Sequence, residues 1–169
     1  MRDDGFEAFF QVAYPRVVGQ LRLLTGDLAA AEDAAQEAFV RAASRWGQLA
    51  RYQQPEAWVR KTAFRLAVDG LRRARRHHGV LVRLAARPEP ATPPPDAEDR
   101  EVVAALQRLP LPQREVLVLH HCLDLPVEAV AAQTGVSVGT VKSRLHRGRE
   151  QLAALLGAEA PGEERHARS

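Results

Sequence analysis

Hydrophobic residues recur at steps of three and four along most of the chain, the spacing that places them on one face of a helix. The first series comprises Phe6, Phe10, Ala13, Val17, Leu21 and Leu24. Pro15 lies inside this series, where it removes one backbone hydrogen bond and could kink the helix without changing its type. No stretch of useful length alternates apolar and polar residues as a half-buried strand does. The pattern therefore predicts an all-α fold.

Turn and capping residues divide the N-terminal half into three predicted helices. The sequence Thr25-Gly26-Asp27 ends the first helix and caps the second, which is expected over residues 28–46. Pro55 suits the first turn of a third helix, expected over residues 55–76. The same reasoning predicts C-terminal helices over residues 98–108, 113–121, 127–133 and 138–156.

A proline-rich segment separates the two halves. Five of the eleven prolines lie between Pro88 and Pro95. Repeated proline removes backbone donors and disfavours helix at each preceding residue, so an extended, exposed spacer is expected. The predicted organisation is two small helical domains over residues 1–76 and 98–156, a flexible linker over 77–97 that is basic and then proline-rich, and a disordered tail over 157–169.

Composition excludes several classes of protein. The single cysteine cannot form an intrachain disulfide, and zinc ribbons need three or four ligands at set spacing. No apolar run approaches the roughly 20 residues needed to span a bilayer. Residues 1–4 carry mixed charge rather than the basic start of a signal peptide. A cytoplasmic protein with no membrane association, no metal and no cofactor is expected.

The net charge of +3 is small, and the distribution of the charged residues along the chain is more informative than the total. Residues 70–88 contain no acidic residue. The arginines in that stretch are Arg72, Arg73, Arg75, Arg76, Arg83 and Arg87. Such clustering indicates a surface that faces a polyanion, and a solvated basic face is the competing interpretation.

The strongest local signal is a helix-turn-helix over residues 126–145. Ala131 is small where the two helices would cross, Gly135 can take the left-handed conformation of the turn, and Ser137 can cap the next helix. The residues expected to fill the core between the helices are Val130, Val136, Val141 and Leu145.

The second helix of this motif is expected to read DNA. On a helical wheel its apolar residues Val138, Val141, Leu145 and Leu152 cluster on one side. The other side is basic and hydroxylated, as suits a helix in the major groove. Base-edge contacts are predicted for Thr140, Ser143, Arg144 and Arg147, and phosphate contacts for Lys142 and the backbone amides near Ser137. The competing interpretation is that the basic residues are merely solvated.

A second nucleic-acid surface is predicted on the third helix. Trp58, Lys61, Arg65, Arg72 and Arg76 fall within a narrow sector of the wheel. An aromatic beside a row of cations suits single-stranded DNA, whose bases stack while its phosphates follow the charge. A core tryptophan beside an ordinary basic face is the alternative. Asp69 interrupts the row and is expected to pair with Arg65 or Arg73 at helical spacing.

The second helix carries a patch of acidic and amide side chains. Asp33, Gln36 and Glu37 share one face, and the opposite face, with Phe39, anchors the helix. The patch could bind a basic protein surface, or it could be a solvated polar face.

Several short motifs lie on both sides of the linker, and their order along the chain is itself informative. They are Leu24-Thr25-Gly26-Asp27, Asp33-Ala34-Ala35-Gln36-Glu37-Ala38-Phe39, Ala57-Trp58-Val59, Leu71-Arg72-Arg73, Leu109-Pro110, Gln113-Arg114-Glu115-Val116 and Val138-Gly139-Thr140-Val141-Lys142-Ser143-Arg144-Leu145-His146-Arg147. With them the chain resembles bacterial RNA polymerase sigma factors of the extracytoplasmic-function (ECF) type, which keep only regions 2 and 4. The resemblance departs from the common pattern at Thr62-Ala63-Phe64-Arg65, where many members carry Ile-Ala-Arg-Asn.

The resemblance implies a promoter-specificity subunit of core RNA polymerase. Asp33, Gln36 and Glu37 would meet the beta-prime clamp helices, and the second domain would lie near the beta flap. The row from Trp58 to Arg76 would open and hold the minus-10 element, and the helix from Ser137 to Arg147 would read the minus-35 element. The basic stretch and linker would pass toward the RNA exit channel. An anti-sigma factor stays open as a further partner.

Two alternatives come from other classes of protein. A stand-alone helix-turn-helix regulator would need neither the patch on the second helix nor the tryptophan row. An enzyme is not supported, because no carboxylate cluster suits metal-assisted phosphoryl chemistry and no nucleophile and base are paired. A metal at His120-His121-Cys122 is disfavoured because adjacent positions on a helix diverge by about 100°. Cys122 is instead expected to be a small core residue or a thiol at a helix end.

Overall fold

A computed structural model describes residues 4–78 and 97–157, and every regular element in these ranges is helical. The predicted all-α fold is confirmed for this part of the chain. The helices form two compact units, Met1–Pro95 and Asp96–Ser169. Most of the expected linker (residues 79–96) and of the expected tail (158–169) lies outside the described residues.

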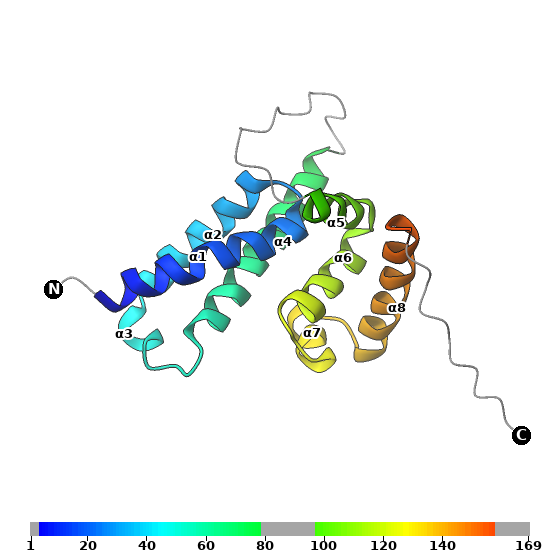
Figure 1. The fold of residues 1–169 in the computed structure, drawn as a ribbon. Coiled ribbons are helices and arrows are strands. Elements are labelled where there is room, and N and C mark those ends of the chain that lie inside the picture. Colours follow the sequence, from blue (N-terminus) through cyan, green and yellow to red (C-terminus); the bar gives the residue numbers. More distant parts are fainter. Residues whose placement is uncertain (1–3, 79–96, 158–169) are drawn as a thin grey trace, which may run out of the picture. The chain divides into compact units, whose positions relative to one another are not determined.

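The described part of unit 1 contains four helices (Figure 1). They are α1 (Asp4–Thr25), α2 (Leu28–Ala43), α3 (Trp46–Leu49) and α4 (Pro55–His78). The three long helices pack against one another pairwise, and their apolar faces form a shared core. Its fully buried residues include Val17, Leu24, Ala35, Phe39, Val59 and Ala63. Pro15 lies within α1, which continues to Thr25.

The turn between α1 and α2 follows the expected chemistry. Gly26 has a φ of 70°, a left-handed conformation that glycine adopts without steric cost. Asp27 is the N-cap of α2, and its carboxylate accepts a 2.8 Å hydrogen bond from the backbone N–H of Ala30. The Thr25 hydroxyl donates to the carbonyl of Asp27 at 2.8 Å. The stop and the cap predicted here are confirmed.

The second helix ends earlier than predicted, at Ala43 rather than near position 46. The physical reason is an aromatic cluster against the start of α1. The ring of Trp46 stacks on Phe9 at 4.9 Å between centroids and meets Phe6 edge-on at 5.3 Å. Trp46 is buried by these contacts, and it begins the separate short helix α3.

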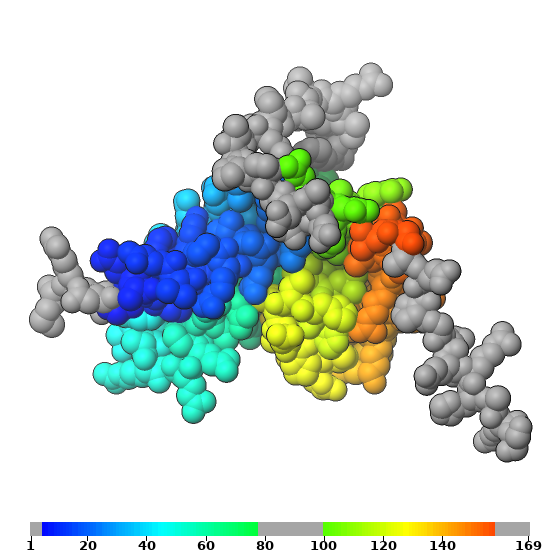
Figure 2. Space-filling view, in the orientation of Figure 1, coloured from blue at the N-terminus to red at the C-terminus, as the bar shows by residue number. Residues whose placement is uncertain are grey.

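Helix α1 runs along the surface of its unit, where it appears in blue in Figure 2. Its exposed side includes Ala8, Val12 and Arg16. The Arg16 guanidinium donates to Glu56 at 2.6 Å, which ties α1 to the first turn of α4. Among the described helices, none is both long and apolar enough to cross a membrane.

Every regular element in the described part of unit 2 is also a helix. The elements are α5 (Ala97–Arg108), α6 (Leu111–Leu117), a π-helical turn η1 (Val118–Cys122), α7 (Val127–Thr134) and α8 (Val138–Leu155). Both α6 and α7 pack on α8. A close approach occurs at Gly148 of α8, where a Cβ atom would lie only 2.9 Å from Cδ1 of Leu117.

One predicted helix of this unit differs at both ends. It begins at Leu111 rather than Gln113, because Pro112 is tolerated in a first helical turn, where its missing N–H has no intrahelical partner. It then widens into η1 instead of continuing regularly to His121. The ring Nδ1 of His120 lies 2.7 Å from the carbonyl of Leu125, and this bond holds the widened turn against the following loop.

Candidate nucleic-acid interface

The helix-turn-helix has the local geometry that its sequence predicts. Gly135 ends α7 with a φ of 72°, and its N–H donates to the Ala131 carbonyl at 2.9 Å. Ser137 caps α8, since its hydroxyl oxygen accepts from the backbone N–H of Thr140 at 3.1 Å. Val130 and Val141 are fully buried between the helices. The turn therefore fixes the start of α8 rigidly.

The two sides of α8 have opposite character. Val141 and Leu145 are buried, while Val138 and Leu152 are half-buried at the edges of the apolar side. Val136 in the preceding turn is also half-buried rather than a full core residue. The predicted DNA contacts Ser137, Lys142, Ser143 and Arg147 are exposed, and Thr140 and Arg144 are half-buried.

Hydroxyl groups at the start of α8 are joined to one another and to the backbone. The hydroxyls of Ser137 and Thr140 lie 2.9 Å apart and share a hydrogen bond. The Ser143 hydroxyl donates to the Thr140 carbonyl at 3.0 Å. These bonds hold the three side chains in defined positions on the exposed side of the helix.

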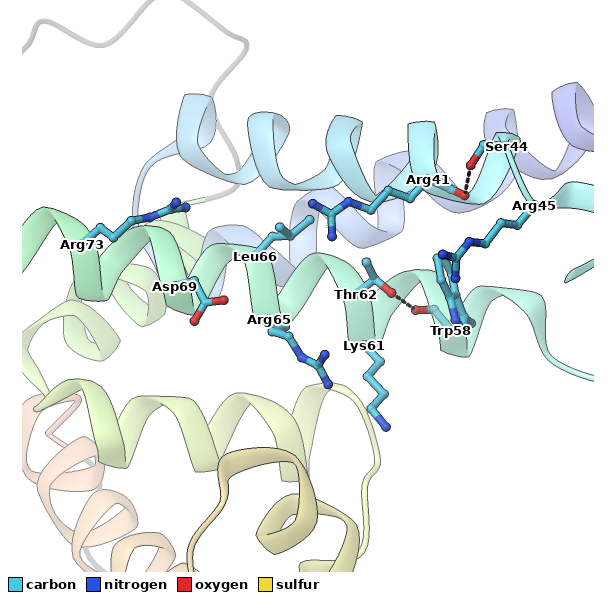
Figure 3. Close-up of a pocket in the computed structure, with 10 residues that line it drawn as sticks. All are labelled: Arg41, Ser44, Arg45, Trp58, Lys61, Thr62, Arg65, Leu66, Asp69 and Arg73. Atoms are coloured by element: carbon cyan, nitrogen blue, oxygen red, sulfur yellow. Dashed lines mark hydrogen bonds between the residues drawn. The ribbon is translucent and has the colours of Figure 1, made fainter.

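A groove with a volume of about 760 Å³ opens between the end of α2 and α4 in unit 1 (Figure 3). Its lining is mainly cationic, with a half-buried tryptophan and one carboxylate. The lining residues are Arg41, Ser44, Arg45, Trp58, Lys61, Thr62, Arg65, Leu66, Asp69 and Arg73. The hydroxyl of Thr62 donates to the carbonyl of Trp58 at 2.9 Å, one turn earlier on α4. The groove thus places an aromatic ring beside five cations, as a single-stranded polyanion requires.

The structure brings together part of the predicted tryptophan row. Trp58, Lys61 and Arg65 line the groove, whereas Arg72 and Arg76 are exposed further along α4 and do not line it. At the departure from the family pattern, Phe64 is buried in the core, and it is Arg65 that reaches the groove.

Asp69 lines the groove without the ion pair expected for it. Within the described ranges it forms no salt bridge with Arg65 or Arg73, and both arginines line the groove beside it. The spacing of three or four residues allows a pair but does not impose one, since an exposed pair of this kind stabilises a helix by only about 0.3–0.5 kcal/mol. The carboxylate therefore reduces the positive charge of the groove directly.

Two cationic groove residues, Arg41 and Arg45, were missed by reasoning from the sequence. They come from the end of α2 and the turn after it. Arg73, which lies beside the predicted row on α4, was already among the arginines predicted to face a polyanion. A helical wheel treats each helix alone, so it could not bring the end of α2 to α4. The one available signal was the spacing of Arg41 and Arg45, four residues apart, at the end of the second helix.

The patch on α2 lies on the exposed side of the helix as predicted. Asp33, Gln36 and Glu37 are exposed, and Phe39 is fully buried on the opposite side. Glu37 accepts a 2.7 Å hydrogen bond from Nε of Arg41, and both side chains are about half-exposed. The patch and the groove are therefore adjacent, since one ion pair links them.

The histidines before the helix-turn-helix have other partners. His121 Nε2 accepts a 3.2 Å hydrogen bond from Nε of Arg149 on α8. Burial, then the charges of Arg149 and His120, lower the pKa of His121. Burial, then Asp124, raises the pKa of the half-buried Cys122 thiol. In the described part of the chain no cluster of three metal-ligating side chains is found.

A helical unit with a cationic groove around a tryptophan, together with a helix-turn-helix whose exposed side is basic, defines a two-part nucleic-acid-binding protein. Family models agree with this division. The model described as "Sigma-70 region 2" matches residues 9–91, and that of "Sigma-70, region 4" matches residues 99–152. The chain belongs to the sigma-70 family of RNA polymerase sigma factors, and within it to the extracytoplasmic-function type.

Relatives with curated names support the same family. The chain is 34% identical to the RNA polymerase sigma factor CarQ of Myxococcus xanthus, over 91% of this chain and 90% of CarQ. It is also 34% identical to the ECF sigma factor SigE of Mycolicibacterium smegmatis, over 79% of this chain and 54% of SigE. The match to RfaY of Xanthomonas campestris, named as a probable sigma factor, has 34% identity and covers 82% of this chain but 39% of RfaY.

Solved structures share the fold. The sigma factor RpoE, crystallised with the anti-sigma factor NepR from Bartonella quintana, matches with a TM-score of 0.68 and 23% identity, over 92% of this chain and 99% of RpoE. The ECF sigma factor SigJ of Mycobacterium tuberculosis matches with a TM-score of 0.60 and 25% identity, over 86% of this chain and 52% of SigJ.

Proposed function

We propose that this protein is a promoter-specificity subunit that binds core RNA polymerase, recognises the minus-35 and minus-10 elements and promotes transcription initiation. The observation that carries the proposal is the groove of unit 1, in which cations from α2 and α4 surround Trp58. A regulator that binds only duplex DNA has no use for such a groove. The role is one of binding, not catalysis, and it is exercised in the cytoplasm, where core polymerase works.

Unit 2 is proposed to read the minus-35 element, as sigma region 4 over residues 98–156. Helix α8 would enter the major groove with its capped N-terminus first. We assign base-edge contacts to Thr140, Ser143, Arg144 and Arg147. Lys142 and the backbone amides near Ser137 would contact phosphates, because a helix N-terminus attracts anions.

Unit 1 is proposed to hold the single-stranded minus-10 element, as sigma region 2 over residues 1–76. Trp58 would stack on a base, and Lys61 and Arg65 would contact phosphates in the groove. Arg72 and Arg76 would extend the cationic track along α4 beyond the groove. The linker over residues 77–97 would connect unit 1, at the minus-10 element, to unit 2, at the minus-35 element.

Core polymerase is proposed to bind the patch on α2. Asp33, Gln36 and Glu37 would contact the beta-prime clamp helices, and unit 2 would contact the beta flap. Charge reversal at Asp33 and Glu37 should abolish co-purification with core polymerase, because two attractive contacts become repulsive. The far-ultraviolet circular dichroism should not change, because both residues are exposed. Full binding by the double variant would remove this face from the proposal.

The test of the function as a whole is run-off transcription with core polymerase over a library of promoters. Transcripts that depend on the added chain are expected, and the promoters that produce them should share two sequence elements. A stand-alone regulator, which is the alternative, would bind duplex DNA in a gel-shift assay without polymerase and would support no transcript. An anti-sigma factor is proposed as a further partner class, on the strength of the RpoE complex with NepR.

A further inference from the structure

An exposed valine lies within the acidic and amide patch of α2. Val40 is 64% exposed, more than the exposed valine of α1, Val12, at 61%. At 100° per residue Val40 lies about 20° from Asp33, about 40° from Gln36 and about 60° from Glu37 around the helix. It therefore extends the face that these three residues form by one further turn.

Two of the three polar residues around Val40, Gln36 and Glu37, are held in place. Gln36 donates from Nε2 to the hydroxyl of Tyr14 at 3.5 Å, and Tyr14 packs edge-on against Phe39. Glu37 is held by its 2.7 Å bond to Arg41. Asp33 makes no hydrogen bond or ion pair among the described residues, so its charge is fully available to a partner. A rim positioned in this way loses little side-chain freedom on binding.

An apolar residue with a polar rim is the arrangement of a binding hot spot. Single exposed apolar residues are normal on soluble proteins, so the exposure of Val40 alone carries no meaning. Its position matters, because the centre of an interface excludes water and the rim supplies charge and hydrogen bonds. The valine of α1 has nearly the same exposure but lies on a different helix, outside the patch.

We propose that Val40 is the apolar anchor of the surface that binds the polymerase clamp. This inference rests on the proposed function and adds one residue to it. The matching partner surface is helical, with an apolar side chain opposite Val40 and cations opposite Asp33 and Glu37. The charge of Asp33, which has no ion partner among the described residues, favours such a partner and disfavours DNA at this face, whereas the charge of Glu37 is balanced by Arg41.

The experiment compares four variants of the full chain for their affinity to core polymerase, by fluorescence anisotropy. Val40→Ala removes apolar area equivalent to about two methylene groups and should weaken binding roughly ten-fold. Val40→Asp should weaken it further, because a carboxylate would be desolvated at the centre of the contact. The matched controls Val12→Ala and Val12→Asp should stay within about two-fold of the unchanged chain, since a residue outside an interface contributes little.

The outcomes separate this inference from the function on which it rests. Unchanged affinity for Val40→Ala and Val40→Asp, with binding lost on the charge reversal at Asp33 and Glu37 described above, would overturn the role of Val40 and leave the function standing. Equal losses for the Val12 and Val40 variants would overturn it as well. If the unchanged chain neither binds core polymerase nor supports run-off transcription, the proposed function itself fails. Circular dichroism of each variant checks that the helices are intact. If Val40→Asp unfolds the protein, the result for Val40→Ala, a substitution that favours helix, tests the inference on its own.

Discussion

Gly148 on α8 faces Leu117 on α6 so closely that a Cβ atom at position 148 would lie 2.9 Å from Cδ1 and 3.2 Å from Cγ of the leucine. Leu117 is buried, so it has little room to move. Glycine at this position is therefore required by packing rather than by backbone conformation. It allows α8, the helix proposed to read DNA, to lie directly on α6.

Replacing Gly148 with alanine should lower the free energy of unfolding. Overpacking a core costs about 1–3 kcal/mol, and the better helix propensity of alanine returns about 1 kcal/mol, so a net loss of about 1 kcal/mol is expected. Gly139→Ala on the same helix is the control, since the nearest atom to its Cβ would be Ser137 Oγ at 3.9 Å. Urea denaturation should show a loss at position 148 and a small gain at 139. A gain at both would mean that α6 and α8 are not in close contact.

Arg147→Ala should weaken binding to one minus-35 sequence more than to others. An arginine that contacts a base edge contributes about 1–3 kcal/mol of discrimination, whereas a phosphate contact contributes equally to all sequences. Lys142→Ala provides the comparison, because Lys142 is assigned to phosphate. Anisotropy titrations against a set of duplexes differing by single base pairs measure both. A uniform loss for Arg147→Ala would reassign Arg147 to the backbone.

Asp69→Asn should raise the affinity of the chain for single-stranded DNA. The substitution removes a negative charge from the groove and keeps the shape of the side chain. A charge about 4 Å from a phosphate in water opposes binding by about 1 kcal/mol, so an increase of up to about five-fold is expected at low salt. Asp33→Asn, on the exposed side of α2, should leave this affinity unchanged. An equal increase for both would show a general charge effect, not a groove effect.

The stability of unit 2 should fall as the solution is acidified. The pKa of His121 is lowered in the folded state from an ordinary value of 6.5, mainly by burial, so the unfolded chain binds more protons. The stabilisation is complete above pH 6.5 and decreases as the pH falls through 6.5 toward the folded pKa. Protonation would also remove the acceptor that Nε2 offers to Arg149. The melting temperature should therefore change more between pH 5 and pH 8 for the unchanged chain than for His121→Gln. The same dependence of melting temperature on pH in both proteins would contradict this role of His121.

The sequence was most informative where structure is local. The cap at Asp27, the left-handed Gly135 and the cap at Ser137 each depend on a few adjacent residues, and each is present in the structure. Periodicity also assigned the exposed and buried sides of α2 and α8 correctly, because one side of each helix must meet a core.

Features that depend on distant residues were not predicted. The break before Trp46 arises from Phe6 and Phe9, some forty residues earlier in the chain. The basic groove combines two helices, and the absence of an ion pair at Asp69 depends on the side chains around it. A pattern along one helix contains no information on such contacts.

The bond from the Ser143 hydroxyl to the Thr140 carbonyl would limit the groups that Ser143 can recognise in its proposed contact with a base. Because its one proton is engaged, the oxygen can act toward a base only as an acceptor. In the major groove the exocyclic amines of adenine and cytosine are donors, while guanine O6 and thymine O4 are acceptors. At the position facing Ser143, promoters should therefore favour adenine or cytosine on the contacted strand, a preference that the helix backbone imposes on the DNA sequence.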